Sequence, residues 1–363
     1  MKKGKQDELQ VKKYLKEILF LLISICGAFF ISGLIILFSG EHPSEVFSIF
    51  IEGIFGSTEG ILYTLFFSTP LIFTGLSVAF ALKGGLFNIG AEGQLYIGSM
   101  AAAFVGFTLV NFPPVVLIPL TILVSIIGGG LWGSIAGFLK AKFGSHEVIN
   151  TIMLNFIAIS LVGYLSSGPF KNPGDQIPQT PLISESARIP EIHTIFPAFP
   201  ETVPLNISFF IAIFSAIFAY VLLKYTKLGY EIRSVGFNPD ASRLSGISLI
   251  KINLLTMFIS GAFAGMVSIN EVLGYRYRFL NNFSPGYGYF GIAVALLGKN
   301  HPLGVIASAI FFGAISRGGL LVDIHSDRIS RDVIFVIQGI IILFVISREL
   351  MSVIAKRKKY TAL

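Results

Sequence analysis

ALKGGLFNIGAEGQLYIGSMAAA, residues 81–103, interrupts the most apolar part of the chain with charged side chains, amides and closely spaced glycines. The polar residues are Lys83, Asn88, Glu92 and Gln94. Backbone at membrane depth must find hydrogen-bond partners, so a glycine-rich break persists only where protein covers it or where it lines a water-filled cavity. Two interpretations follow: a tight cytoplasmic turn between two helices, or a broken helix at a transport site.

The composition around this stretch is that of a polytopic membrane protein. Of the 363 residues, 53% are hydrophobic and only 13% are charged. Several apolar runs reach the ~20 residues that cross a ~30 Å hydrocarbon layer. The formal net charge of +7 does not indicate a nucleic-acid partner, because the basic residues flank apolar segments, where they set orientation and meet anionic membrane lipid. The composition therefore disfavours a soluble enzyme, and no nucleic acid is expected as a partner.

The sequence contains no motif for catalysis or for metal binding. Cys26 is the only cysteine, so an intrachain disulfide and a cysteine-based metal site are excluded. The five histidines share no helical spacing that would gather a metal ion. HExxH, an acid pair on one helix and a serine with a nearby histidine are all missing from the sequence. We expect no catalytic residue, no metal and no cofactor.

The distribution of lysine and arginine predicts the orientation in the membrane. Segments expected on the cytoplasmic side are the basic N-terminus 1–17, the loop 224–253 and the basic tail 348–363. Residues 39–59 and 167–206 are poor in lysine and arginine and are expected outside. Both termini are then cytoplasmic, which requires an even number of spans.

The apolar runs predict an all-α transmembrane domain over residues 18–347, with ten spans and with eight as the alternative. The ten are 18–38, 60–81, 95–110, 115–139, 148–166, 207–223, 254–273, 289–298, 303–316 and 333–346. The external loop 167–206 holds eight of the 16 prolines, so we expect it to be irregular or extended. Whether it contacts an external partner or only caps the membrane domain is open.

A weak internal repeat relates two distant stretches. At an offset of 193 residues, Asn88, Gly93, Tyr96, Gly98 and Ala102 match Asn281, Gly286, Tyr289, Gly291 and Ala295. These stretches lie five predicted spans apart, so they run in opposite directions, as in transporters built from inverted repeats. We therefore expect a pseudo-symmetric inverted repeat with two broken regions facing one another.

The predicted substrate pathway uses polar side chains near these two regions. They are Asn88, Glu92, Gln94, Glu271 and Asn281. Amides and a few carboxylates among glycines suit a neutral, hydroxylated solute, since glycine lets backbone groups approach it closely. The alternative is that Glu92 pairs with Lys83 as a structural clamp.

GYEIRSVGFNPDASRLSGI, residues 229–247, predicts a short helix on the basic side. Asn238 is a favoured N-cap, Pro239 fits the first helical position, and Gly246 suits the left-handed residue after the end. These signals delimit a two-turn helix over 239–245. Because such a short helix has little stability alone, it packs either on the membrane domain or on another protein.

The two stretches resemble one family. KGGLFNIGAEGQLYIGSMAA (83–102) is similar to the signature of ABC importer permease subunits for ribose-type sugars, branched-chain amino acids and nucleosides, and is most similar to the nucleoside (simple-sugar-like) branch. EVINTIMLN (147–155) and SPGYGYFGIAVALLGKNHPLG (284–304) also resemble this family, so the likeness covers most of residues 60–345. Asn155 is expected to serve packing, since amides bond across helices in lipid.

The resemblance extends to the short cytoplasmic helix. The pattern Arg233, Gly236, Asn238, Pro239, Ala241 and Gly246 is similar to the family's coupling helix. In that family this helix docks into a groove of the ATPase subunit. The resemblance therefore implies that these residues couple the permease to ATP hydrolysis.

The resemblance implies a permease of the bacterial cytoplasmic membrane for nucleosides first, simple sugars second and branched-chain amino acids third. Separate ABC ATPase subunits are expected, because the chain lacks GxxxxGK[ST]. The other implied partners are a second permease, expected to be a paralogue, and an external solute-binding (lipo)protein. The alternative is an ion-coupled secondary transporter, which needs ionisable groups in mid-membrane, where only Glu92 and Glu271 are candidates.

Overall fold

A computed structural model describes residues 26–27, 29–326, 328–329, 335–336, 338–340 and 343. The chain divides into two compact units, residues 61–314 and residues 1–60 with 315–363. The basic termini 1–17 and 348–363 lie outside the described residues. So do the beginning of the expected first span and most of the expected tenth.

Most of the described residues lie in helices, and apart from isolated bridges none of them forms a β-strand. The helices that belong wholly or mostly to the larger unit are α3 (Thr58–Lys83), α4 (Ala91–Thr108), α5 (Pro114–Phe143), α6 (Glu147–Ser167), α8 (Ser208–Tyr225), α9 (Lys227–Phe237), α10 (Pro239–Leu244), α11 (Leu249–Gly265), the π-helix η2 (Ile269–Arg276) and α12 (Tyr287–Leu297). Helix α13 (Pro302–His325) begins in this unit and ends in the other.

Within the described part of the chain, six helices are long and apolar enough to cross a membrane. They are Thr58–Lys83, Pro114–Phe143, Glu147–Ser167, Ser208–Tyr225, Leu249–Arg276 and Pro302–His325. Helix α4 is not among them because of its polar first turn, and Tyr287–Leu297 is shorter than a full crossing. The protein is thus a multi-pass membrane protein, and the count of ten stays a prediction.

Two segments expected as loops are partly helical. Residues 39–59 contain α2 (Pro43–Phe55), which begins with a proline at its first turn and belongs to the smaller unit. In that unit Val46 of α2 clusters with Ile36, Val322 and Ile329. The segment 224–253 is not an open loop, because α9 and α10 fill most of it and α11 already begins at Leu249.

Close helix packing holds the larger unit together. Helices α5 and α11 lie against each other along a seam of small residues, where Gly129 and Gly261 bring the two backbones into contact. Gly98 of α4 joins the same seam, since a Cβ there would lie 2.9 Å from the Ser125 carbonyl oxygen of α5. Small residues of this kind allow helices to associate in lipid through van der Waals packing.

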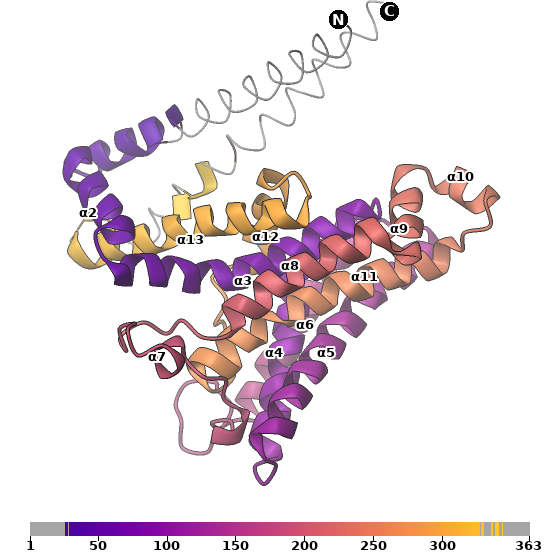
Figure 1. Cartoon of the computed structure of the whole chain (residues 1–363), viewed down its shortest axis with the longest axis horizontal. Coiled ribbons are helices and arrows are strands. Elements are labelled where there is room, and N and C mark those ends of the chain that lie inside the picture. The colour runs from indigo at the N-terminus through magenta and orange to yellow at the C-terminus, as the bar shows by residue number, and fades with distance from the viewer. Residues whose placement is uncertain are drawn as a thin grey trace, which may run out of the picture. The chain divides into compact units, whose positions relative to one another are not determined.

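The two ends of the larger unit differ (Figure 1). At one end, α9 and α10 follow α8 and precede α11. At the other end, residues 168–207 form an irregular segment that contains only η1 (Glu185–Ala187), α7 (Ile192–Ile195) and isolated bridges. The irregular form predicted for the proline-rich loop is confirmed.

This loop is fastened to the membrane helices by its backbone. The Ile183 N–H donates to the Tyr277 carbonyl at 2.8 Å, and the Ser184 N–H donates to the Gly106 carbonyl of α4 at 2.9 Å. The Thr180 N–H donates to the Phe279 carbonyl at 3.0 Å. The loop therefore caps the ends of α4 and η2.

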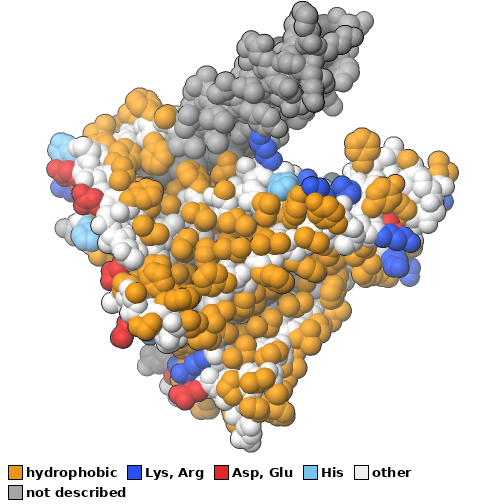
Figure 2. Space-filling model, viewed as in Figure 1, with side chains coloured by type: hydrophobic (Ala, Val, Ile, Leu, Met, Phe, Trp, Pro, Cys, Tyr) orange, Lys and Arg blue, Asp and Glu red, His pale blue; other side chains and the backbone are white. Residues whose placement is uncertain are grey.

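Figure 2 shows hydrophobic side chains spread over the outer face of α8 and its neighbours, with Lys and Arg gathered toward α9 and α10. On α8 the exposed side chains include Phe210, Phe214 and Phe218. An apolar face of this extent is expected for helices in contact with lipid or with another membrane subunit.

Candidate functional site

The break between α3 and α4 is a short, ordered connection. Helix α3 ends at Lys83, and α4 begins at Ala91. Gly85 has a φ of +73°, a conformation that favours glycine. Leu86 anchors the connection because its side chain is buried in a cluster with Ala81 and Met257.

Asn88 lies at the centre of a buried amide and hydroxyl network. Its Nδ2 lies 2.7 Å from the Ser260 Oγ, 2.8 Å from the Gln94 Oε1 and 3.2 Å from the Ser77 Oγ. The Gln94 Nε2 donates back to the Asn88 Oδ1 at 3.0 Å, and the Gly90 N–H donates to the same oxygen at 3.0 Å. This network, which we call the Asn88 network, ties α3, α4 and α11 together.

Glu92 joins the first turns of α4 and α12. Its Oε2 accepts a hydrogen bond from the Gly288 N–H of α12 at 2.6 Å. Nearby, the Ser284 N–H donates to the Tyr96 hydroxyl of α4 at 3.3 Å. A carboxylate is favourable at helix N-termini, where backbone N–H groups carry partial positive charge. Glu92 therefore bonds to the backbone of α12 rather than to Lys83.

Asn155 of α6 supports the same break. Its Oδ1 accepts from the Gly93 N–H at 2.8 Å, and its Nδ2 donates to the Ile89 carbonyl at 2.9 Å. The packing role expected for Asn155 is confirmed, and it serves the backbone on both sides of the first residues of α4.

Glu271 and Asn281 form hydrogen bonds with residues outside the Asn88 network. The Glu271 carboxylate is buried in η2 and accepts from the Tyr287 hydroxyl at 3.2 Å and the Arg276 Nε at 3.1 Å. Asn281 follows η2 at the loop end, where its N–H donates to the Pro178 carbonyl at 3.0 Å. The structure thus connects Asn88 with Gln94, while Glu92, Glu271 and Asn281 have other partners.

Four of the five predicted pathway residues are closed to solvent in this conformation. Asn88, Glu92, Gln94 and Glu271 are at most 3% exposed. Sequence reasoning missed Ser77 and Ser260, because single serines in apolar helices carry no signal of their own. Only the fold brings these residues, 183 positions apart, to 3.1 Å between their hydroxyl oxygens.

The second candidate site is formed by α9 and α10. Asn238 ends α9, with its N–H donating to the Ser234 carbonyl at 3.0 Å, and it caps α10, with its Oδ1 accepting from the Ala241 N–H at 3.0 Å. Pro239 occupies the first turn, and Gly246 has a φ of +83° just after the helix. The predicted cap residues therefore form a short helix, which ends one residue earlier than expected, at Leu244.

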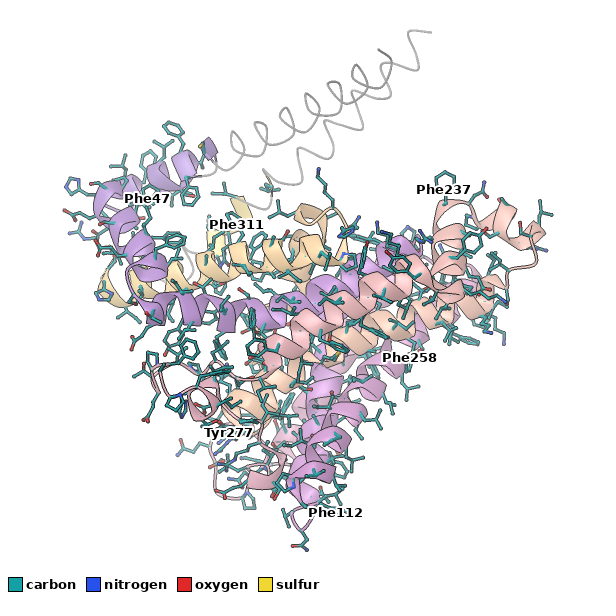
Figure 3. All side chains as sticks on the ribbon, viewed as in Figure 1. Phe47, Phe112, Phe237, Phe258, Tyr277 and Phe311 are labelled. Atoms are coloured by element: carbon teal, nitrogen blue, oxygen red, sulfur yellow. The ribbon has the colours of Figure 1, made fainter. Side chains whose placement is uncertain are left out.

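A groove of about 450 Å³ lies between α9 and α10. It is lined by Tyr230, Arg233, Ser234, Phe237, Asn238, Ala241, Ser242, Ser245 and Ile247. Phe237 and Leu244 are 94% and 90% exposed, so two large apolar side chains face outward beside the groove. Figure 3 shows Phe237 pointing away from the helices.

The structure offers no group of three or more His, Cys, Asp or Glu residues that could hold a metal ion, within the residues described. Membrane helices interrupted by buried polar breaks, together with a capped helix at their basic end, are typical of membrane transport proteins.

Comparison with known proteins identifies the family. The family described as branched-chain amino acid transport system / permease component matches residues 60–346. The chain belongs to this permease family. No solved structure matches the chain.

The relatives are ABC transporter permeases. The guanosine ABC transporter permease protein NupP of Bacillus subtilis is 38% identical over 96% of this chain and 98% of the relative. The nucleoside ABC transporter permease protein NupB of Lactococcus lactis is 32% identical over 95% and 94%, respectively. The glucose ABC transporter permease protein TsgB13 of Haloferax volcanii is 32% identical over 90% and 87%. The chain is therefore an ABC transporter permease, a transport subunit and not an enzyme.

The same two bacteria each have a second, less similar permease. NupQ of Bacillus subtilis is 28% identical over 73% of this chain and 83% of the relative. NupC of Lactococcus lactis is 29% identical over 69% and 78%, respectively. In each species the two proteins carry the same description, guanosine or nucleoside ABC transporter permease.

Proposed function

We propose that this permease imports nucleosides across a bacterial cytoplasmic membrane. The observation that carries the proposal is the 38% identity with a guanosine permease over 96% of the chain, supported by the 32% identity with a nucleoside permease. Simple sugars are the second candidate, because a glucose permease is also 32% identical. The family description keeps branched-chain amino acids as the third.

The first proposed partner is a separate ABC ATPase that receives α10. Supporting this, Phe237 and Leu244 are large apolar side chains left almost fully exposed at the basic end, where burial against a partner would be favourable. Arg233 lines the groove, and Arg243 lies on α10. The receiving surface of the ATPase would therefore be apolar with acidic groups at its edge. Of the predicted coupling pattern, Arg233, Asn238 and Ala241 line the groove. Pro239 begins α10, and Gly246 follows its end.

The second proposed partner is another permease, and the third is an external solute-binding lipoprotein. The paired permeases of Bacillus subtilis and Lactococcus lactis support a paralogue rather than a second copy of this chain. The loop 168–207, which caps α4 and η2, is the surface proposed to meet the binding protein. The proposed orientation has this loop outside and both termini in the cytoplasm, and the lysine and arginine distribution supports it.

The proposed architecture has ten spans with an inverted repeat. Shifting α3 by the 193-residue offset places it over residues 251–276, close to the continuous Leu249–Arg276 span. The same shift places the start of α4 at residue 284, three positions before α12 begins. The first turns of α4 and α12 also meet, through Glu92 and Gly288.

For the solute pathway, we propose that Asn88, Glu92, Gln94, Glu271 and Asn281 act in another conformation. The described conformation pairs their side chains inside the protein or places them at the loop end. Alternating access requires at least one further arrangement, in which paired groups become accessible. The same carboxylates would carry the ion in the alternative mechanism, an ion-coupled secondary transporter.

The test uses this permease expressed with its neighbouring transport subunits and reconstituted into proteoliposomes. We expect an ATPase to co-purify, and we expect guanosine uptake to require ATP and the binding protein. Uptake should persist with ionophores and stop when the ATPase carries an inactivating Walker A lysine substitution. Excess glucose and leucine serve as competitors for the two other solute classes. Uptake driven by an ion gradient without ATPase would contradict the proposal.

A further inference from the structure

Backbone contact joins α9 directly to the break between α3 and α4. Gly236, near the end of α9, lies against the backbone of Lys83, Gly84 and Gly85. A Cβ at Gly236 would lie 2.8 Å from the Gly84 carbonyl carbon and from the Gly85 nitrogen, and closer still to the Lys83 carbonyl oxygen. In the reverse direction, a Cβ at Gly85 would lie 2.9 Å from the Gly236 Cα. The two segments touch without any side chain between them.

On the side of the break, close packing leaves residues 83–85 no room to move independently. A Cβ at Gly84 would lie 2.7 Å from the Thr256 Cγ2 of α11. Leu86 is 3% exposed, and Asn88 is held by the Asn88 network. Because close-packed interiors transmit displacement rather than absorb it, a shift of Gly85 moves Asn88 and the start of α4.

On the α9 side, the contact continues to α10 through a rigid corner. Asn238 is bonded to both helices through its backbone N–H and its side chain. The Ser242 hydroxyl donates to the Asn238 carbonyl at 2.9 Å and fixes the first turn of α10 to the same residue. A displacement of α10 therefore reaches Gly236 without a flexible linker.

We propose that Gly236 and the backbone of residues 83–85 form the joint through which movement of α10 reaches the Asn88 network. Gly236 is then a positioning residue, and it has to be glycine because any side chain would push the break away from α9. This inference rests on the proposed docking of α10 to an ATPase. It assigns a role to Gly236 and Gly85 distinct from docking, since neither lines the groove.

The first variant is Gly236→Ala in the reconstituted importer. The added methyl meets backbone atoms only, so the break has to shift, while the groove and the cap of α10 keep their residues. We expect ATPase co-purification and ATP hydrolysis at the wild-type level, with guanosine uptake per ATP reduced about tenfold. A purely structural defect would instead lower the amount of assembled complex and leave uptake per ATP unchanged.

The second variant tests the same joint from its other side. Gly84→Ala should crowd the Thr256 methyl, and it should lower uptake per ATP in the same way. Adding Thr256→Ala removes that methyl, so the double variant should recover most of the uptake. The Thr256 hydroxyl has no hydrogen-bond partner, so its removal leaves no buried group unpaired. Gly33→Ala is the matched control, because its Cβ would come no closer than 3.6 Å to its nearest neighbour, the Phe47 ring.

The outcomes separate this inference from the proposed function. Wild-type protein that binds no ATPase, or imports no solute with ATP, would overturn the proposed function and the joint with it. A functional wild-type importer together with wild-type uptake per ATP in Gly236→Ala would overturn the joint alone. If Gly236→Ala fails to reach the membrane, the uptake per ATP of Gly84→Ala becomes the test of the joint. Normal uptake per ATP in Gly84→Ala, or a loss that Thr256→Ala does not relieve, would then overturn it.

Discussion

Asn88→Ala should destabilise the fold by separating α4 from the helices on either side. The substitution removes both hydrogen bonds between Asn88 and Gln94, at 2.8 Å and 3.0 Å, and leaves the buried Gln94 amide without these partners. An unpaired buried polar group costs about 1–3 kcal/mol, so we expect the free energy of unfolding to fall by about 2–4 kcal/mol once the cavity is included. Side-chain hydrogen bonds between membrane helices average about 0.6 kcal/mol each, so the reciprocal pair should contribute about 1 kcal/mol of coupling.

A double-mutant cycle with Asn88→Ala and Gln94→Leu measures this coupling. Unfolding by SDS can be followed through the fluorescence of Trp132, the only tryptophan, whose Nε1 lies 3.3 Å from the Leu154 carbonyl oxygen of α6. The double variant should lose less than the sum of the single losses. Thr121→Ala is the control partner, because its hydroxyl bonds only within α5 and its effect should add. The network as described would be refuted if the losses in free energy of unfolding of the two single variants summed to that of the double variant within about 0.3 kcal/mol.

Three further predictions concern the ends of the larger unit. Gly246→Val should strain the residue at φ +83° that follows α10, where open space surrounds the glycine, at a cost of about 1–2 kcal/mol. Uptake and ATPase co-purification should fall at an unchanged membrane level. Gly144→Val imposes the same strain at φ +66° after α5, and an equal loss of uptake there would contradict a special role for α10. In a variant without the native cysteine, Glu185→Cys should react with an impermeant thiol reagent in whole cells and Ser245→Cys only after permeabilisation. Labelling of Ser245→Cys in intact cells would overturn the orientation. Hydrogen bonds from two neighbouring amide side chains hold the pKa of Asp175 below its usual value. The stability that Asp175 gives the loop is therefore complete above about pH 4, and it is lost as the pH falls through the lowered pKa of the folded state. Hydrogen exchange of residues 171–179, corrected for the intrinsic rate, should rise over that range in the wild type and not in Asp175→Asn.

The short cytoplasmic helix shows how far local sequence signals reach. Asn238, Pro239 and Gly246 predict its start and end because capping depends on residues only a few positions apart. The structure places all three as expected. Helix α9 in the same segment was not predicted, although Thr226 caps its first turn by accepting from the Gly229 N–H at 3.0 Å. One threonine is a weak signal by itself, and packing against neighbouring segments stabilises this helix. Gly229 and Gly236 meet the backbones of α8 and of the break, and only tertiary contacts bring these together.

The candidate site divides in the same way. The polar break at residues 84–90 could be located from the sequence, since glycines and amides stand out among apolar residues. Its partners could not, because Ser77, Ser260 and Gly288 resemble ordinary residues of apolar helices. The Lys83 pairing considered for Glu92 is not the one in the structure, where Glu92 accepts from the Gly288 N–H at 2.6 Å. The sequence gives no sign that α12 supplies this partner.

The sequence by itself determined that this protein is an all-helical membrane permease of the ABC transporter family. Hydrophobic length, charge distribution and family motifs are properties of the chain that need no long-range contact to be read. Only the tertiary structure decided that the broken region is closed, with its amides and carboxylates paired inside the protein. It also decided that α9 touches that region through Gly236. Hydrogen bonds and backbone contacts between residues more than 150 positions apart depend on how the helices pack, which the order of residues along each helix does not specify.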